Sequence, residues 1–177
     1  MLEIILGSIV LIALLIMVIV IIHNKFQFSI IKIEEAENNI DILLQKKLEL
    51  LKRSRPIIKK ELKLDDFLDN LEGVEDKELN HFELNSTLKE AYNTLFQTLD
   101  DNEKLFKSDS LISIINEVNH NEIDLVAAVK FYNDTVVVFN QLIVSFPSNI
   151  IRLLFRYKKK EFYNNEKREI YEILKDN

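Results

Sequence analysis

The sequence predicts an all-α protein in which an N-terminal transmembrane helix continues into an antiparallel bundle of long helices. Three observations favour this fold. The chain has only 2 Gly and 2 Pro among 177 residues, whereas all-β folds need many residues that tolerate turn conformations. Residues 4–22 form an apolar run that only Gly7 and Ser8 interrupt. Beyond this run, apolar residues recur at spacings of three and four, the period of one helical face.

The apolar run predicts a membrane span. A helix of about 19 residues rises about 28 Å, close to the roughly 30 Å of a bilayer's hydrocarbon core. A buried core helix is disfavoured, because so long a stretch without charge is rare in soluble domains. A cleaved signal peptide is a second alternative. It would need a basic N-terminus and a small-residue cleavage pattern, whereas this chain offers Glu3 and Ile21-Ile22-His23-Asn24.

The charges that flank the span predict its orientation. Lys25, Lys32, Lys46 and Lys47 follow the span, and no Lys or Arg precedes it. The positive-inside rule therefore predicts a single-pass protein of the cell membrane with its N-terminus outside and its bulk in the cytoplasm.

The first helix is expected to run from the bilayer to about Lys52, because no helix breaker intervenes before Pro56. Pro56 is then expected to end or kink it. Gly73 lies in an acidic stretch and predicts a loop. Three long amphipathic stretches with short links favour an up-down-up path with coiled-coil-like packing.

Two further long helices are expected. Thr87 and Glu90 have the spacing of a capping box, which predicts a helix from there to near Lys107. Asp109 or Ser110 is expected to cap the last long helix, which Pro147 stops. A basic segment (152–160) and a short polar helix, Glu166 to Lys175, follow. The expected organisation is an anchor (1–23), a bundle (24–160) and a polar C-terminal helix or tail (161–177).

Composition narrows the function classes. The formal charge is −6, which argues against bulk nucleic-acid binding, since that needs positive charge to neutralise phosphates. Cys is absent, which excludes disulfides and thiolate metal sites. His23, His81 and His120 are scattered, without the paired spacing of a metal site. No nucleophile-elbow motif is present. We therefore expect no catalytic residues, metal or cofactor.

Three polar residues mark a stripe of the last long helix. Glu122, Asn133 and Asn140 are spaced by eleven and seven, which places them along one side. The rest of the stripe is apolar: Val126, Val129, Val136 or Val137, and Val144. A buried amide without a hydrogen bond costs about 1–3 kcal/mol, so partners are expected among Lys46, Lys47 and Asp41. We interpret the stripe as a structural polar ladder that sets helix register; a ligand-binding stripe is the alternative.

Basic residues gather in two clusters. The first comprises Lys46, Lys47, Lys52, Arg53, Arg55, Lys59 and Lys60, and the second comprises Arg152, Arg156, Lys158, Lys159 and Lys160. The plain interpretation is two solvated faces. A lipid partner would require the rod to lie flat, because Lys47 lies about 37 Å beyond Ile22 on a continuous helix. The up-down-up path predicts instead one basic tip, distal to the membrane, that docks an acidic protein partner.

Two stretches resemble signatures of one protein family. The first reads Ile33-Glu34-Glu35-Ala36 through Ile40-Asp41-Ile42-Leu43-Leu44-Gln45-Lys46-Lys47. The second contains Glu122, Leu125, Ala128, Phe131-Tyr132-Asn133, Phe139-Asn140 and Phe146-Pro147-Ser148-Asn149. They resemble the LemA family, with its patterns V-x-x-A-W-x-x-I-D-V-x-L-K-R-R, E-x-x-I-x-x-A-R-x-x-Y-N, Y-N and F-P-S-N. The resemblance covers the anchor, residues 23–52 and residues 86–160, with Leu105 at the Leu of Y-P-x-L-K.

The departures indicate a divergent member. Val129 replaces the Arg before Y-N, and His23-Asn24 replaces the Y-N after the membrane. Leu50-Leu51-Lys52 stands at L-I-P and Asn102-Glu103 at Y-P. The resemblance implies a membrane-anchored helical bundle of a bacterium and no particular chemistry.

Together these features favour a membrane-tethered interaction or scaffold protein that presents a bundle surface to protein partners, with a homo-oligomer left open. A cell-envelope-side binding or assembly factor is one alternative, which topology would distinguish. A hydrolytic enzyme is another. It would require a pocket in which replacing Glu122 abolishes an activity without unfolding the bundle.

Overall fold

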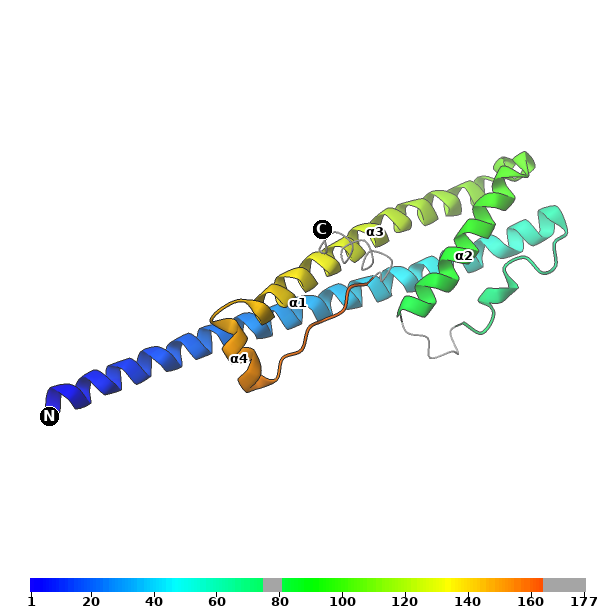
Figure 1. Ribbon diagram of the computed structural model, residues 1–177. Coiled ribbons are helices and arrows are strands. Elements are labelled where there is room, and N and C mark those ends of the chain that lie inside the picture. The colour runs from blue at the N-terminus through cyan, green and yellow to red at the C-terminus, as the bar shows by residue number, and fades with distance from the viewer. Residues whose placement is uncertain (75–80, 164–177) are drawn as a thin grey trace, which may run out of the picture. The chain divides into compact units, whose positions relative to one another are not determined.

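The computed structural model describes residues 1–74 and 81–163, and these residues form helices and no strand (Figure 1). Along the chain lie α1 (Leu2–Leu62), the short 3₁₀ helix η1 (Asp69–Leu71), α2 (His81–Asp100), a second 3₁₀ helix η2 (Glu103–Lys107), α3 (Asp109–Val144) and α4 (Ser148–Phe155). The predicted all-α fold with a long N-terminal apolar helix is confirmed. The expected C-terminal helix, Glu166 to Lys175, lies outside the described residues.

The chain divides into two compact units. We call Met1–Ala36 with Phe131–Asn177 the terminal unit, and Glu37–Lys130 the central unit. Each unit takes one part of α1 and one part of α3.

Helix α1 is longer than the sequence predicts, because Pro56 does not end it. The helix has 61 residues, with Pro56 in its interior. A proline inside a helix costs about 3 kcal/mol through its missing N–H and its ring. On either side, Leu51 and Ile58 are fully buried, and Ser54 Oγ donates to the Leu51 carbonyl at 2.8 Å. We attribute the continuation to this burial, which offsets the local cost at an exposed proline.

In the central unit, α3 runs antiparallel to α1. Asn121 donates to the Leu43 carbonyl, while Glu117 pairs with Arg53 further along α1, so residue numbers fall on α3 as they rise on α1. Leu50, Ile114 and Val118 form a buried cluster between them, with Tyr92 and Phe96 of α2 packed against it.

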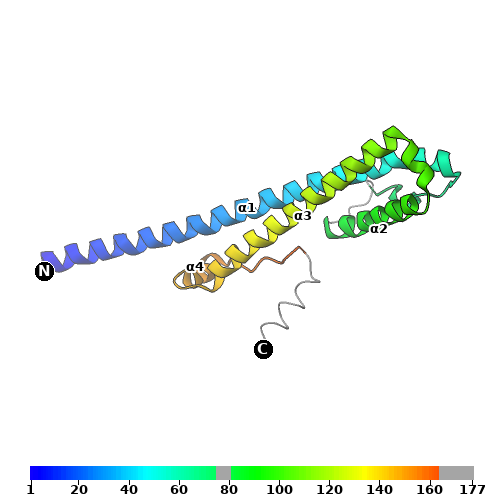
Figure 2. The same ribbon diagram turned by 90° about the horizontal axis from the view of Figure 1, so that it is seen from above.

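Helix α2 runs parallel to α1, so the predicted up-down-up path is wrong. Figures 1 and 2 both show α2 beginning beside the middle of α1 and running toward the C-terminal end of α1. Residues 63–80 link α1 to α2. A link of this length does not force α2 to run antiparallel to α1, as a tight turn would. Arg55 Nε holds the described part of this link by donating to the Phe67 carbonyl at 2.9 Å. Gly73 has φ +67° in a turn, as a loop requires.

The predicted starts of α2 and α3 are both displaced. Helix α2 begins at His81, and Thr87 Oγ1 donates to the Glu83 carbonyl at 3.0 Å, so Thr87 is an interior residue and not a cap. Leu84 and Leu88 are both buried and carry the helical pattern across the expected start. For α3, Ser108 Oγ accepts from the Leu111 N–H at 3.4 Å, which makes Ser108 the capping residue in place of Asp109 or Ser110. Helix α2 ends at Asp100, before the expected Lys107.

Helix α4 was not predicted. The segment read as basic, residues 152–160, begins inside this helix, which meets α3 at 93°. Arg156, with φ 58°, ends α4, and its successor Tyr157 donates its N–H to the Arg152 carbonyl at 3.1 Å.

Candidate functional site

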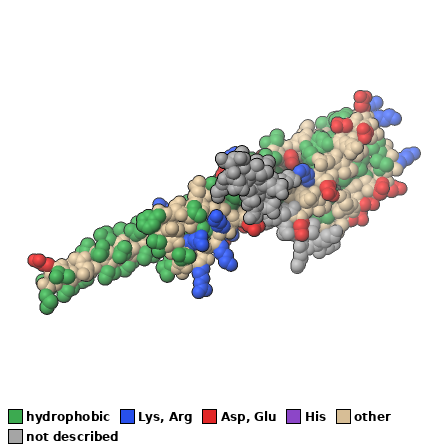
Figure 3. Space-filling model, viewed as in Figure 1, with side chains coloured by type: hydrophobic (Ala, Val, Ile, Leu, Met, Phe, Trp, Pro, Cys, Tyr) green, Lys and Arg blue, Asp and Glu red, His purple; other side chains and the backbone are tan. Residues whose placement is uncertain are grey.

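Most of the apolar run of α1 is exposed and packs against no described part of the chain. In the described part of the chain, α1 is long and apolar enough to cross a membrane, and none of its most apolar window is buried. Figure 3 shows this stretch covered by hydrophobic side chains. The first buried residues of α1 are Ile22 and Phe26. A core helix of a soluble domain would be largely buried, so the buried-core interpretation of this run does not fit the described structure.

An aromatic cluster follows directly after the run. Tyr157 Oη and His23 Nδ1 form a hydrogen bond of 3.0 Å, and Gln27 Nε2 donates to the same hydroxyl at 2.8 Å. The Tyr157 ring stacks on Phe26 with 4.4 Å between centroids, and Phe155 lies 4.3 Å from the His23 ring. These contacts hold the end of α4 beside the first two turns of α1 after the apolar run.

The second basic cluster therefore lies beside residues 23–27 of α1. Arg156 and Lys158 flank Tyr157 in the chain, and Lys159 and Lys160 follow. Among the described residues, no carboxylate forms an ion pair with this cluster; the ion pairs in the described structure involve other side chains.

Helix α4 carries an apolar face that the described structure leaves uncovered. Ile150, Leu153 and Leu154 are 56%, 70% and 66% exposed, and Phe146, four residues before Ile150, is 80% exposed. The spacing of three and four places Ile150, Leu153 and Leu154 on one side of the helix, and Phe146 lies just before its start. Ile151, on another side, is buried in the terminal unit.

The first basic cluster is largely paired within the central unit. Lys47 Nζ lies 2.5 Å from Glu122 Oε2 and 4.9 Å from the centre of the Tyr92 ring. Arg53 lies 3.6 Å from Glu117. Arg55 contacts Asp69 and lies 2.7 Å from Glu72, and Lys59 lies 2.9 Å from Asp69.

The first basic cluster belongs to the central unit and the second to the terminal unit, so one shared distal tip stays a prediction. Within the terminal unit, the second cluster is held at His23 and Gln27. The prediction followed from the up-down-up path, in which α3 would end far from the membrane. Helix α3 instead returns antiparallel to α1, and α4 follows it.

Among the described residues of the central unit, Asp69, Arg55 and Tyr92 have shifted pKa values. A hydrogen bond from Lys59 is the main cause that lowers the pKa of Asp69, with Arg55 adding to it. Burial opposes the charge of Arg55, but its bonds to Glu72 and Asp69 raise its pKa overall. Burial raises the pKa of Tyr92, and the charge of Glu122 adds to that effect. The shifts of Asp69 and Arg55 belong to ion pairs that hold the link, and the shift of Tyr92 comes mainly from its burial in the bundle.

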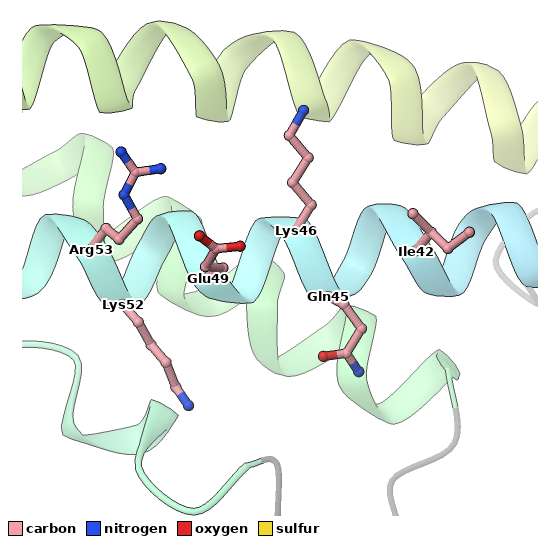
Figure 4. Close-up of a pocket in the computed structure, with 6 residues that line it drawn as sticks. All are labelled: Ile42, Gln45, Lys46, Glu49, Lys52 and Arg53. Carbon is pink, nitrogen blue, oxygen red and sulfur yellow. The ribbon is translucent and has the colours of Figure 1, made fainter.

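A shallow hollow of about 620 Å³ lies on α1. Figure 4 shows Lys46 and Arg53 extending to one side of α1, and Gln45 and Lys52 to the other. Ile42 and Glu49 complete the lining, so one helix supplies every residue. Within the described ranges, no group of three or more His, Asp or Glu side chains could hold a metal ion.

Comparison with protein families agrees with the resemblance in the sequence. Residues 36–173 match the model of the LemA family. The chain belongs to the LemA family. No curated protein and no solved structure matches it. The family match assigns a fold and an ancestry and no activity.

The family's Y-N signatures have a visible structural role in this LemA-family chain. Asn140 Oδ1 accepts from the Lys160 N–H, and Asn140 Nδ2 donates to the Lys160 carbonyl, both at 2.9 Å. Asn133 Oδ1 accepts from the Tyr163 N–H at 2.8 Å, and Tyr132 Oη donates to the Glu161 carbonyl at 3.0 Å. These residues therefore hold the segment after α4 against α3.

The predicted polar ladder thus has two kinds of partner. Glu122 pairs with Lys47, one of the expected partners, while Asn133 and Asn140 bond the C-terminal segment and not α1. All three are half-buried, and Val126 and Val144 of the same stripe are exposed.

The fully buried amide of α3 is Asn121, which the sequence interpretation missed. Its Nδ2 donates to the Leu43 carbonyl at 3.1 Å, and its Oδ1 accepts no bond from the described residues. The signal was its spacing: Asn121 lies three residues after Val118 and four before Leu125, both buried.

Proposed function

We propose that this LemA-family protein is a non-enzymatic, membrane-anchored scaffold whose helical bundle faces the cytoplasm and presents a surface to protein partners. One observation carries the proposal. Helix α1 passes without a break from an apolar, unpacked stretch into a buried one that starts at Ile22 and Phe26. An anchor that is continuous with a packed helix ties the terminal unit directly to the bilayer.

The same continuity supports a retained anchor over a cleaved signal peptide. Signal peptidases cut after a short apolar region, in an accessible segment with small residues. Here the corresponding residues are helical, and His23 bonds Tyr157. Cleavage after Asn24 would remove Ile22 and His23 from the packing of the terminal unit.

The partner surface that we favour is an exposed apolar patch on α3 in the central unit. Ile123 and Val126 are three residues apart and both exposed, and exposed apolar patches mark interaction sites more often than single exposed residues do. Lys47, Arg53, Arg55 and Lys59 of the first basic cluster, by contrast, are committed to internal pairs. An apolar partner surface therefore suits this unit better than a purely electrostatic one.

Cysteine labelling tests the topology. The chain has no Cys, so Asn93→Cys, an exposed position on α2, and Leu2→Cys, exposed at the start of α1, each give one reactive thiol. With a membrane-impermeant maleimide, we expect Leu2→Cys to react in intact cells and Asn93→Cys to react only after lysis. Reaction of Asn93→Cys in intact cells would place the bundle on the outer side and favour the envelope-side binding or assembly factor.

A second experiment tests the scaffold role. Proteins cross-linked in membranes to the full-length chain are compared with those captured by Ile123→Glu together with Val126→Glu. Loss of specific partners with unchanged helicity supports the proposal. Identical capture would count against this surface, and a catalytic turnover that depends on Glu122 in the folded protein would count against a non-enzymatic role.

A further inference from the structure

We propose that α4 and the basic segment after it form a second membrane contact, which docks on an anionic lipid surface next to the span. This inference rests on the anchor in the proposed function. It adds that the terminal unit touches the bilayer through a surface helix as well as through α1. Four observations of the terminal unit support it: an uncovered apolar face, its level along α1, the direction of α4 and its charge.

The apolar face has the pattern of an interfacial helix. Phe146, Ile150, Leu153 and Leu154 are all more than half exposed, although each is a residue that soluble proteins usually bury. Helices that lie in a membrane interface bury such a face about 5–10 Å into the boundary between headgroups and acyl chains.

The level of α4 along α1 matches the headgroup layer. Phe155 and Tyr157 contact His23, Phe26 and Gln27, which lie about 2–8 Å beyond Ile22 at about 1.5 Å per residue. A bilayer of about 40–45 Å with a core of about 30 Å leaves roughly 5–8 Å of headgroups on each side. A helix at this level meets lipid without any movement of the protein.

The direction of α4 suits a membrane surface. In the terminal unit α3 runs beside α1, where Phe139 packs edge-on against Phe26 at 5.8 Å (Figures 1 and 2). Helix α4 turns away from α3 by 93°. It therefore runs across the direction of α1, so an α1 that crosses the bilayer leaves α4 near the membrane plane.

The charge of the segment is opposite to that of the chain as a whole. Residues 148–160 contain five basic residues and no acidic one, in a protein whose formal charge is −6. Near an anionic surface each Lys or Arg strengthens binding roughly fivefold, and the cytoplasmic leaflet is anionic. A protein partner could also cover an apolar face, but it would not explain why the face lies at the end of the span.

Tryptophan fluorescence of the full-length protein tests the docking. The chain contains no Trp, so Leu153→Trp places a single reporter on the exposed face of α4. The protein is reconstituted into vesicles of phosphatidylcholine and phosphatidylglycerol, with or without brominated acyl chains, which quench only a Trp that reaches them. We expect a blue-shifted emission that the brominated lipid quenches.

Two matched variants separate the possible failures. Ile16→Trp lies in the span and must be quenched if α1 inserts. Phe131→Trp is exposed on α3 in the same unit and should remain unquenched, because it lies eight residues before Phe139, which packs against Phe26. Quenching of Ile16→Trp without quenching of Leu153→Trp overturns the docking of α4 and leaves the anchor intact. Absence of quenching at both positions overturns the anchor itself.

The charge requirement has its own test. In the Leu153→Trp background, Lys158→Gln with Lys159→Gln should lower the quenching in phosphatidylglycerol vesicles, as should vesicles of phosphatidylcholine alone. If quenching persists equally in both, α4 binds lipid without selecting anionic headgroups, and the anionic part of the proposal is overturned. If disulfide cross-linking through Leu154→Cys joins two chains while Leu153→Trp stays unquenched, the face belongs to a second copy.

Discussion

At the scale of single residues, Lys47 shows how a charge can be kept inside the bundle. Its side chain is 1% exposed, its Nζ lies 2.5 Å from Glu122, and the Tyr92 ring lies 4.9 Å away. Removing an ammonium from water costs several kcal/mol, which only a close counter-charge and further contacts offset. Glu122 itself is 32% exposed, so water solvates the carboxylate and reduces the cost of the pair.

Glu122→Gln should therefore destabilise the protein by about 2–3 kcal/mol, less than the roughly 3–5 kcal/mol of a fully buried broken pair. Chemical denaturation in detergent, followed by circular dichroism, measures the change. Glu49→Gln, an exposed carboxylate on α1, is the control and should change stability by no more than about 0.5 kcal/mol. Adding Lys47→Met to Glu122→Gln should restore part of the lost stability. A further loss would contradict the explanation that the unpaired, buried charge of Lys47 destabilises Glu122→Gln.

Asp69 predicts a dependence of stability on pH. Its pKa in the folded protein is lowered below the ordinary 3.8, chiefly by the hydrogen bond from Lys59. A lowered folded pKa contributes stability that is fully present above the unfolded value and is lost as pH falls through the folded value. The difference in melting temperature between the wild type and Asp69→Asn should thus be constant above about pH 5 and shrink at lower pH. A difference that grows on acidification would contradict this sign.

At the scale of elements, hydrogen bonds from side chains of α3 order residues 157–163. This segment has no regular secondary structure, so its backbone groups need other partners. Asn140, Asn133 and Tyr132 supply them at Lys160, Tyr163 and Glu161. The segment in turn carries Tyr157, which joins the end of α4 to α1.

Asn140→Ala should loosen this segment without unfolding the bundle. It removes two hydrogen bonds, each of about 0.5–1.5 kcal/mol, and thus raises local opening roughly tenfold. Limited trypsin digestion, with mass spectrometry to find cuts after Lys158, Lys159 and Lys160, measures the opening. Asn93→Ala, at an exposed position of α2, should digest like the wild type. Equal digestion of all three proteins would show that Asn140 does not order the segment.

At the scale of the whole molecule, one helix carries both the apolar run and part of the bundle's framework. Residues 2–18 of α1 are exposed in the described chain, Ile19 is half-buried, and full burial begins at Ile22. The stability of the bundle should therefore not depend on the apolar run, while attachment to the membrane should.

Deletion of residues 2–21 should leave the helical circular dichroism per remaining bundle residue and the unfolding transition unchanged. In cells the full-length chain should stay with membranes in high salt, because an apolar span is not released by screening. The deleted form should leave the membrane in high salt, because only the basic segment around Lys158 would then attract it. A deleted form that unfolds would show that the apolar run supports the bundle.

Much of the fold could be predicted because its signals are local. The apolar run of residues 4–22, the scarcity of Gly and Pro, and the helical period of Ile33, Ala36 and Ile40 depend only on neighbours in the chain. The same locality explains the errors at Thr87 and Pro56. A capping box or a proline has a local preference that the burial of Leu88, Leu51 and Ile58 overrides.

The candidate sites could be predicted less well. Lys47 was a predicted partner of Glu122, but Asn133 and Asn140 bond a segment about 20–30 residues later in the chain. No periodicity in one helix indicates which distant backbone will lie against it. Asn121 was missed for a different reason. It is a single polar residue between buried apolar ones, whereas Glu122, Asn133 and Asn140 form a row of polar residues.

The sequence by itself determined the family, the helical class and the presence of a stretch able to span a membrane, because each follows from composition, period and short motifs. Only the tertiary structure decided that α2 runs parallel to α1 in the central unit, that α4 forms at all, and that the second basic cluster lies beside His23. The physical reason is that the direction of a helix depends on the path of the link before it and on the burial of both faces. The charge and hydropathy along the chain specify neither the path of the link nor the burial of the two faces.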